Sequence, residues 1–231
     1  MRIENVKGIV WDLDGTLLDS FGIFEQVLAD VVQQSGHVMP TREYMLNNYH
    51  GSLEETVQRV LGIGSAEELD EVISSFLEKQ ETHYAGDLET HLYNDASMLA
   101  QQAAKLEIRQ LLVTNRFHKG RGNASPKAII AATTLADCIQ EVRTGDEIEY
   151  RKPDKRSVSD WIEKHQITPE ELIVIGDQFV DAELAVNLGA RAIITRRGVD
   201  IPHLNTLGKE SLKNIIIVDG LENIELIPVR S

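Results

Sequence analysis

The sequence predicts an α/β protein in which a parallel sheet is covered by helices on both faces and is interrupted by an all-helical insert. Two observations lead to this fold. Short apolar runs recur along the chain with helical patterns between several of them, and this alternation is typical of parallel sheets. The stretch from about residue 20 to residue 93 differs, because it has helical periodicity and no convincing strand.

The apolar runs give the expected elements in chain order. The first expected strand covers residues 7–12 and ends in a carboxylate, and further strands are expected at 110–114, 172–176, 191–195 and 214–218. Helical patterns lie between several of these runs, at 124–134, 154–165 and 181–188. Ligands of such sheets bind at the carboxyl ends of the strands, so the residues at those ends are the candidates for a functional site.

Apolar side chains in the insert recur on one face of each of two expected helices. They are Phe21, Phe24, Leu28, Val31 and Val32 in the first helix and Leu69, Val72, Ile73, Phe76 and Leu77 in the second. Asp19 or Ser20 is expected to cap the first helix. The predicted division is an α/β core of residues 1–18 and 94–231 and a helical cap of residues 19–93.

Composition excludes several classes of function. The 231 residues carry 37 acidic and 23 basic side chains, which gives a formal net charge of −14. A surface this acidic repels nucleic acid and anionic lipid, so neither is an expected partner. Cys138 is the only cysteine, and we expect it to be a small buried side chain. The N-terminus lacks the apolar stretch of a signal peptide and the apolar runs are too short to span a bilayer, so we expect a cytoplasmic protein.

Polar side chains follow three of the expected strands. The strand expected at 7–12 ends in Asp12 and is followed by Asp14, the strand at 110–114 leads into Thr114 and Asn115, and the strand at 172–176 is followed by Asp177 and Asp181. Lys152 lies between the last two groups in the sequence. Because the carboxyl ends of parallel strands meet at one edge of a sheet, these groups can share a site.

These residue types suit the chemistry of a phosphoryl group. Asp12 and Asp14 are two residues apart after a strand, so their side chains point to the same side. With Asp177 they would repel one another unless a cation lay among them, and oxygen ligands of this kind suit Mg²⁺. Lys152 adds positive charge and Thr114 a neutral donor, so the set can position and neutralise a phosphoryl group.

The motifs that contain these residues resemble those of the haloacid-dehalogenase-like superfamily. The run Trp-Asp-Leu-Asp-Gly-Thr-Leu-Leu-Asp-Ser from residue 11 resembles the first motif, and Thr114-Asn115 resembles the second. Lys152, within Arg-Lys-Pro-Asp, resembles the third, and the run from Gly176 that contains Asp177 and Asp181 resembles the fourth. All four occur in order, and the helical insert matches the position of the cap in the phosphoglycolate-phosphatase-like branch. The resemblance therefore implies a Rossmann-like core.

The resemblance implies a role for each motif residue. Asp12 would be the nucleophile that forms an aspartyl-phosphate, and Asp14 would be the general acid and then the general base. Mg²⁺ would be held by Asp12, the backbone carbonyl of Asp14 and Asp177. The remaining catalytic groups would be Thr114, Asn115 and Lys152, which bind the phosphoryl oxygens, and Asp181, which orients Lys152 or a metal-bound water.

Two segments are candidates for contact with the rest of the substrate. In the insert, His50 and Gly51 lie where the family places a substrate-facing loop, and an ordinary turn is the alternative interpretation. The stretch from Arg116 to Lys127 contains five basic or histidine residues and no acidic one, so it could attract an anionic substrate, with a solvated loop as the alternative.

The sequence predicts a phosphatase for a small phosphorylated metabolite. By resemblance the substrate would be phosphoglycolate, while sugar phosphates and nucleotides stay open. The alternatives are a sugar-phosphate mutase of the same family, which returns the phosphoryl group to a sugar, and a non-catalytic binding protein that retains the fold. One departure from the family has no explanation in the sequence, because Asn94-Asp95 stands where a Pro-Gly pair is usual.

Overall fold

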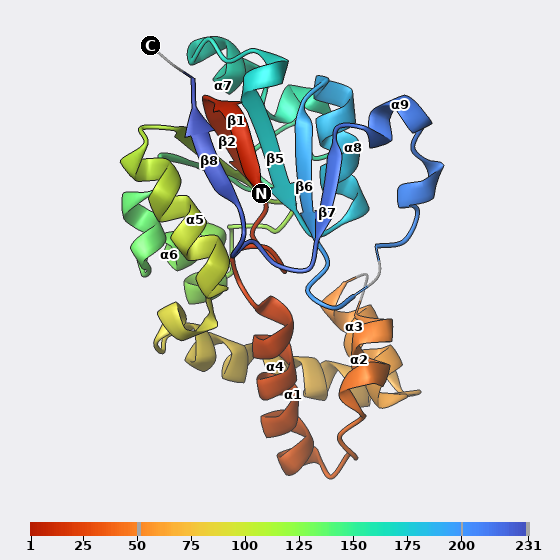
Figure 1. Cartoon of the computed structure of the whole chain (residues 1–231). Coiled ribbons are helices and arrows are strands. Elements are labelled where there is room, and N and C mark those ends of the chain that lie inside the picture. Colours follow the sequence, from red (N-terminus) through yellow and green to blue (C-terminus); the bar gives the residue numbers. More distant parts are fainter. Residues whose placement is uncertain (50–51, 200, 230–231) are drawn as a thin grey trace. The chain divides into compact units, whose positions relative to one another are not determined.

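The chain forms two compact units in a computed structural model that describes residues 1–49, 52–199 and 201–229 (Figure 1). The core unit consists of Met1–Leu18 and Leu92–Ser231, and the helical unit consists of Asp19–His91. The boundary expected from the sequence, after residue 93, lies two residues further along the chain.

A parallel sheet forms the centre of the core unit. Its strands are β2 (Gly8–Trp11), β3 (Arg109–Val113), β4 (Glu141–Arg143), β5 (Leu172–Gly176), β6 (Arg191–Thr195) and β7 (Ile215–Val218), which lie in the order β4-β3-β2-β5-β6-β7. The chain therefore proceeds outwards from β2 on one side and then crosses back to build the other side. A reversal of this kind makes a crevice at the carboxyl ends of the central strands.

The three central strands end nearly level with one another. Trp11 of β2 lies opposite Leu112 of β3 and Ile175 of β5. The amide of Asp12 continues this ladder, because it donates to the carbonyl of Ile175 at 2.8 Å. The polar residues that follow the three strands consequently leave the sheet at the same edge.

Helices cover both faces of the sheet. They are α5 (Asn94–Lys105), α6 (Pro126–Ala131), α7 (Ser159–Lys164), α8 (Phe179–Leu188) and the short α9 (Lys209–Leu212). On one face, Leu111 belongs to the same buried cluster as Trp161 of α7 and Leu184 of α8. The preceding residue in β3 points to the other face, where the side-chain amide of Gln110 donates to the carbonyl of Ala100 in α5 at 2.9 Å. The predicted α/β fold with helices on both faces is confirmed.

Three strands were not expected from the sequence. β1 (Arg2–Val6) and β8 (Glu225–Pro228) pair in parallel as a separate two-stranded sheet, and β4 forms one edge of the main sheet. The expected helix at 124–134 is shorter, because α6 is flanked by the 3₁₀ turns Gly122–Ala124 and Thr134–Asp137. The expected helix at 154–165 likewise divides into the 3₁₀ turn Lys155–Ser157 and α7.

The helical unit contains α1 (Ser20–Ser35), α2 (Arg42–Asn48), α3 (Leu53–Leu61), α4 (Ala66–Tyr84) and the 3₁₀ turn Leu88–His91. Asp19 caps α1, since its carboxylate accepts from the amide of Gly22 at 2.9 Å. The apolar faces of α1 and α4 meet, with 5.4 Å between the ring centroids of Phe24 and Phe76. Leu77 does not share the buried face that its spacing suggested, because it is 42% exposed. None of the helices in the described ranges is long and apolar enough to cross a membrane.

Candidate functional site

A small pocket opens at the carboxyl ends of β2, β3 and β5 in the core unit. Its lining brings together most of the residues that the sequence singled out and adds two that it did not. The lining residues are Asp12, Asp14, Thr114, Asn115, Arg116, Lys152, Gln178, Val180 and Asp181. Gln178 and Val180 were missed, although both lie beside Asp181 at the start of α8, where they could have been found.

Lys152 lies between two carboxylates at the base of this pocket. Its Nζ atom donates to Oδ1 of Asp12 at 2.5 Å and to Oδ1 of Asp181 at 2.7 Å, and all three side chains are buried. Burial alone would lower the pKa of Lys152, but the charges of Asp12 and Asp181 raise it above its ordinary value. Lys152 therefore carries a fixed positive charge.

Burial has the opposite consequence for the carboxyl group of Asp12. Loss of solvent raises the pKa of Asp12 to about 7; Lys152 offsets part of this increase, and the nearby Asp181 and Asp14 add to it. Asp177 behaves in the same way, because burial and then the charge of Asp12 raise its pKa well above the ordinary value. The cluster therefore holds more negative charge than its one lysine can neutralise.

This excess charge fits a divalent cation. Ligand oxygens of Asp12, Asp177 and Asp181 lie within 4.8 Å of one another. Oδ1 of Asp177 is buried and has no hydrogen-bond partner within the described part of the chain, which is the state expected of an oxygen that coordinates a metal. The donor set consists of oxygens only, as Mg²⁺ prefers. The residues present therefore suit the expected ion.

The turn that carries Asp14 is shaped to meet Asp177. Gly15 has φ +77, and a Cβ atom at this position would lie 2.1 Å from Oδ2 of Asp177. Only glycine combines this backbone conformation with so close an approach of a carboxylate. The two acidic motifs, which are far apart in the sequence, thus pack directly against each other.

Asp181 is held by α8 itself. It occupies the third position of the helix, where its Oδ2 accepts from the amide of Gln178 at 3.2 Å. Since its Oδ1 accepts from Lys152, both oxygens of Asp181 are engaged. This arrangement fixes the carboxylate that holds Lys152 in place.

The residues after β3 form the other wall of the pocket. Thr114 is buried, and its Oγ1 accepts from the amide of Arg116 at 3.0 Å, which leaves the hydroxyl hydrogen to be donated elsewhere. Asn115 donates to the backbone carbonyl of Lys152 at 3.2 Å. The guanidinium of Arg116 forms an ion pair with Asp14, at 3.2 Å between Nη2 and Oδ1.

Three other residues of the basic stretch contact acidic side chains, two of them through backbone amides. The carboxylate of Asp146 accepts from the amides of His118 and Lys119 at 2.8 and 2.9 Å, and Lys127 pairs with Glu147 at 2.5 Å. Arg116 is thus the member of this stretch that lines the pocket. The candidate residues His50 and Gly51 lie outside the described residues.

Comparison with known families identifies the chain. Residues 9–195 match the family described as haloacid dehalogenase-like hydrolase. The chain belongs to this family. The match spans all of the strand ends that build the pocket, from Asp12 to Asp181.

Proteins similar in sequence to this haloacid dehalogenase-like hydrolase include phosphoglycolate phosphatases. The phosphoglycolate phosphatase of Aliivibrio fischeri is 25% identical over 200 residues, which cover 84% of this chain and 86% of that protein. The phosphoglycolate phosphatase of Vibrio vulnificus strain CMCP6 is 28% identical over 196 residues, which cover 82% of this chain and 83% of that protein. The predicted family and the phosphatase class of the enzyme are confirmed.

Solved structures of the family share the fold. A predicted phosphoglycolate phosphatase from Haemophilus somnus superposes with a TM-score of 0.71 at 16% identity, over 94% of this chain and 96% of that one. A Thermotoga maritima protein provisionally named beta-phosphoglucomutase superposes with a TM-score of 0.70 at 16% identity, over 94% of this chain and 95% of that one. At these identities the likeness concerns the fold alone.

Proposed function

We propose that the protein is a Mg²⁺-dependent phosphatase that hydrolyses a small phosphate monoester through an aspartyl-phosphate on Asp12. The observation that supports this proposal most strongly is the placement of Asp12, which lies at the pocket base 2.5 Å from the ammonium group of Lys152. A buried carboxylate next to a fixed positive charge can attack a phosphoryl group without repelling it.

Asp14 is the proposed acid and base. It lines the same pocket two residues after the nucleophile, and 29% of its side chain is exposed, so it can reach both the leaving oxygen and an attacking water. It would donate a proton to the leaving group and then remove one from the water that hydrolyses the aspartyl-phosphate. Thr114, Asn115 and Lys152 would bind the phosphoryl oxygens during both steps.

The proposed Mg²⁺ ligands are Asp12, Asp177 and the backbone carbonyl of Asp14. The buried Oδ1 of Asp177, which lacks a hydrogen-bond donor in the described ranges, supports this assignment. The ion would supply charge neutralisation for the phosphoryl oxygens, since Lys152 alone cannot balance the carboxylates. Asp181 would act on Lys152, because both of its oxygens are already engaged.

The proposed substrate class is a small phosphate ester such as phosphoglycolate or a sugar phosphate. The relatives at 25% and 28% identity are phosphoglycolate phosphatases, which favours this class. Arg116 would contact an anionic part of the substrate, and contacts from His50 and Gly51 stay a prediction. A mutase would use the same nucleophile, so the products must distinguish the two functions.

The test is phosphate release from a panel of small phosphate esters with Mg²⁺. Wild type should release phosphate and Asp12→Asn should not, while Asp160→Asn, which alters a carboxylate paired with Arg143 outside the pocket, should remain active. Formation of an isomeric sugar phosphate in place of free phosphate would favour the mutase. No reaction of a folded wild type with any ester would contradict both.

A further inference from the structure

The turn that carries Asp12 and Asp14 closes largely on itself. The carbonyl of Leu13 accepts from the amides of Leu17 and Leu18 at 3.0 and 2.9 Å, and the amide of Gly15 donates to the carbonyl of Leu18 at 2.8 Å. The carbonyl of Thr16 instead accepts from outside the turn, from Nη2 of Arg197 at 3.3 Å. A residue 181 positions away thus contacts the nucleophile turn.

Arg197 lies in the loop after β6 and has an unusual backbone. Its φ is +50, in the left-handed region that non-glycine residues seldom adopt. Its side chain is 16% exposed and lies over the ring of Tyr93, with 4.0 Å from the guanidinium carbon to the ring centroid. A backbone of this kind persists where the side chain is well held, and Arg197 is held on two sides.

The second restraint is Asp95, at the start of α5. Its Oδ2 accepts from Nη1 of Arg197 and from the amide of Leu221, each at 2.6 Å, and the side chain is 14% exposed. Burial alone would raise the pKa of Asp95, but the hydrogen bonds from Arg197 and Leu221 lower it below its ordinary value. Asp95 is therefore ionised near neutral pH and makes charge-assisted hydrogen bonds.

These contacts join four segments of the core unit. Asp95 and Arg197 link α5, the loop after β6 and the segment before β8 to the carbonyl of Thr16. The amide of Tyr93 adds a direct bond to the carbonyl of Leu17 at 2.9 Å. The nucleophile turn is thus fixed to the rest of the core unit at Thr16 and Leu17, while Gly15 packs against Asp177.

We infer that Arg197 and Asp95 are positioning residues for the proposed phosphatase reaction, which fix the turn 12–18 and thereby the carboxylate of Asp12. The inference rests on the proposed function. The inference also gives Asp95 a role at a position where the family usually has another residue, because Asp95 anchors Arg197. Neither side chain lines the pocket, so both act through the turn.

A positioning role predicts a change in kcat rather than in KM. Loss of the Thr16 contact lets the nucleophile move relative to bound substrate, and displacements of about 1 Å cost up to about 100-fold in rate. Arg197→Gln and Asp95→Asn should therefore lower kcat on the order of 10- to 100-fold with KM nearly unchanged. The double variant should be no worse than the more severe single one, because Asp95 acts through Arg197.

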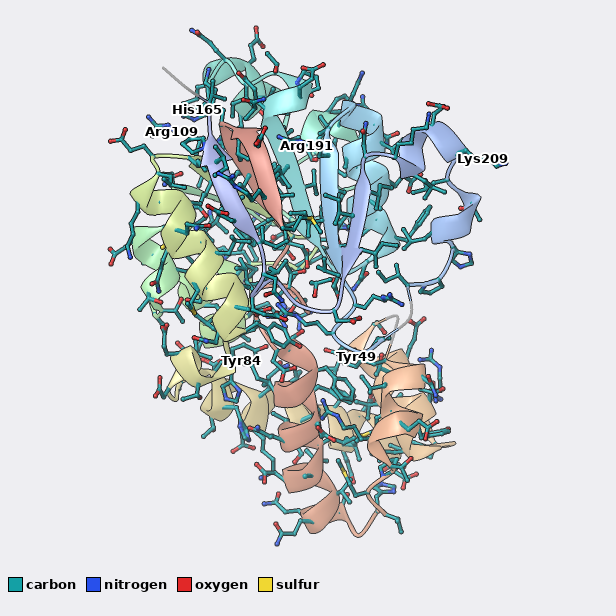
Figure 2. All side chains as sticks on the ribbon, viewed as in Figure 1. Tyr49, Tyr84, Arg109, His165, Arg191 and Lys209 are labelled. Carbon is teal, nitrogen blue, oxygen red and sulfur yellow. The ribbon has the colours of Figure 1, made fainter. Side chains whose placement is uncertain are left out.

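The matched control is Arg191→Gln. Arg191, labelled in Figure 2, begins β6, the strand that Arg197 follows. Its guanidinium donates to the carbonyls of Glu4 and Glu170, each at 2.8 Å. Its loss should reduce stability while kcat is retained. Arg197→Lys keeps the charge without the planar fork, so it should recover stability and only part of kcat.

Two readouts keep this inference separate from the proposed function. Kinetics are measured with each variant well below its melting temperature, and thermal stabilisation by Mg²⁺ with beryllium trifluoride, a mimic of the phosphoryl group on an aspartate, is measured in parallel. The ligand-induced shift should shrink in Arg197 and Asp95 variants and persist in Arg191→Gln. An active wild type with normal kcat and a normal shift in Arg197→Lys and Asp95→Asn would overturn the positioning role alone. A wild type that neither hydrolyses esters nor binds the mimic would overturn both.

Discussion

The ammonium group of Lys152 lies 2.5 Å from Oδ1 of Asp12, and both side chains are buried. A buried pair of this kind is costly to break, because removing one partner leaves the other charge without compensation. In this chain the imbalance would be greater, since Asp177 and Asp181 belong to the same cluster.

Replacing Lys152 with methionine should therefore destabilise the protein by about 3–5 kcal/mol. The pKa of Asp12 is already raised to about 7, and loss of Lys152 raises it further. A carboxyl group with a raised folded-state pKa costs stability once the pH exceeds its unfolded value, near about 4. Wild type shares this cost up to about pH 7, so in urea unfolding the deficit of Lys152→Met relative to wild type should grow as the pH rises above about 7. A deficit independent of pH would contradict the raised pKa of Asp12.

Binding of Mg²⁺ should tighten as the pH rises through about 7. Burial raises the pKa of Asp12 to about 7, so below this pH the carboxyl group is largely protonated and an ion must displace a proton. Above this pH no proton is displaced from Asp12. Titration calorimetry in two buffers of different ionisation enthalpy should detect proton release at about pH 6 and less at about pH 8. Equal release at both would show that Asp12 does not titrate in this range.

Gly15→Ala should abolish most activity through Asp177. The new Cβ atom would lie 2.1 Å from Oδ2 of Asp177, and φ is +77. Gly36→Ala is the control, because its φ is +76 and no atom of the described residues lies within 4 Å of a Cβ atom there. Both variants should lose about 1–2 kcal/mol from backbone strain, but only Gly15→Ala should also lose Mg²⁺ binding. Intact Mg²⁺ binding in Gly15→Ala would argue against Asp177 as a ligand.

The contribution of Asp95 should disappear in acid. Burial alone would raise the folded-state pKa of Asp95, but the hydrogen bonds from Arg197 and Leu221 lower it below the ordinary value. A lowered folded-state pKa stabilises above the unfolded value and is lost as the pH falls through the folded one. The difference in unfolding free energy between wild type and Asp95→Asn should be constant near neutral pH and shrink below about pH 4. A difference that persists in acid would mean that the negative charge of Asp95 does not contribute to the free energy of unfolding.

Much of the core unit could be predicted because its central strands are buried on both sides. β2 and β5 are continuous apolar runs of four and five residues that are rich in Ile and Val, which favours strands over helices. β4 could not be predicted in this way, since Glu141–Arg143 has one apolar residue and forms an edge. β1 and β8 bury few residues and pair with each other from opposite ends of the chain, and no local pattern reveals such a partner.

The same distinction applies to the site. Asp12, Thr114 and Asp177 could be predicted because each directly follows a strand, where the sheet itself dictates position. The pair of Arg197 and Asp95 could not, because it joins residues 102 positions apart that belong to no motif. The ion pair of Arg116 with Asp14 likewise depends on how two loops fold towards each other.

In the proposed mechanism Asp12 carries the phosphoryl group during turnover. Wild type should be mixed with substrate and Mg²⁺, quenched in acid within the first turnovers, and digested for mass spectrometry. We predict one added phosphoryl group on the peptide that contains Asp12, absent without substrate and absent from Asp12→Asn. Steady turnover with no phosphorylated Asp12, under conditions that preserve a synthetic acyl phosphate, would contradict the mechanism.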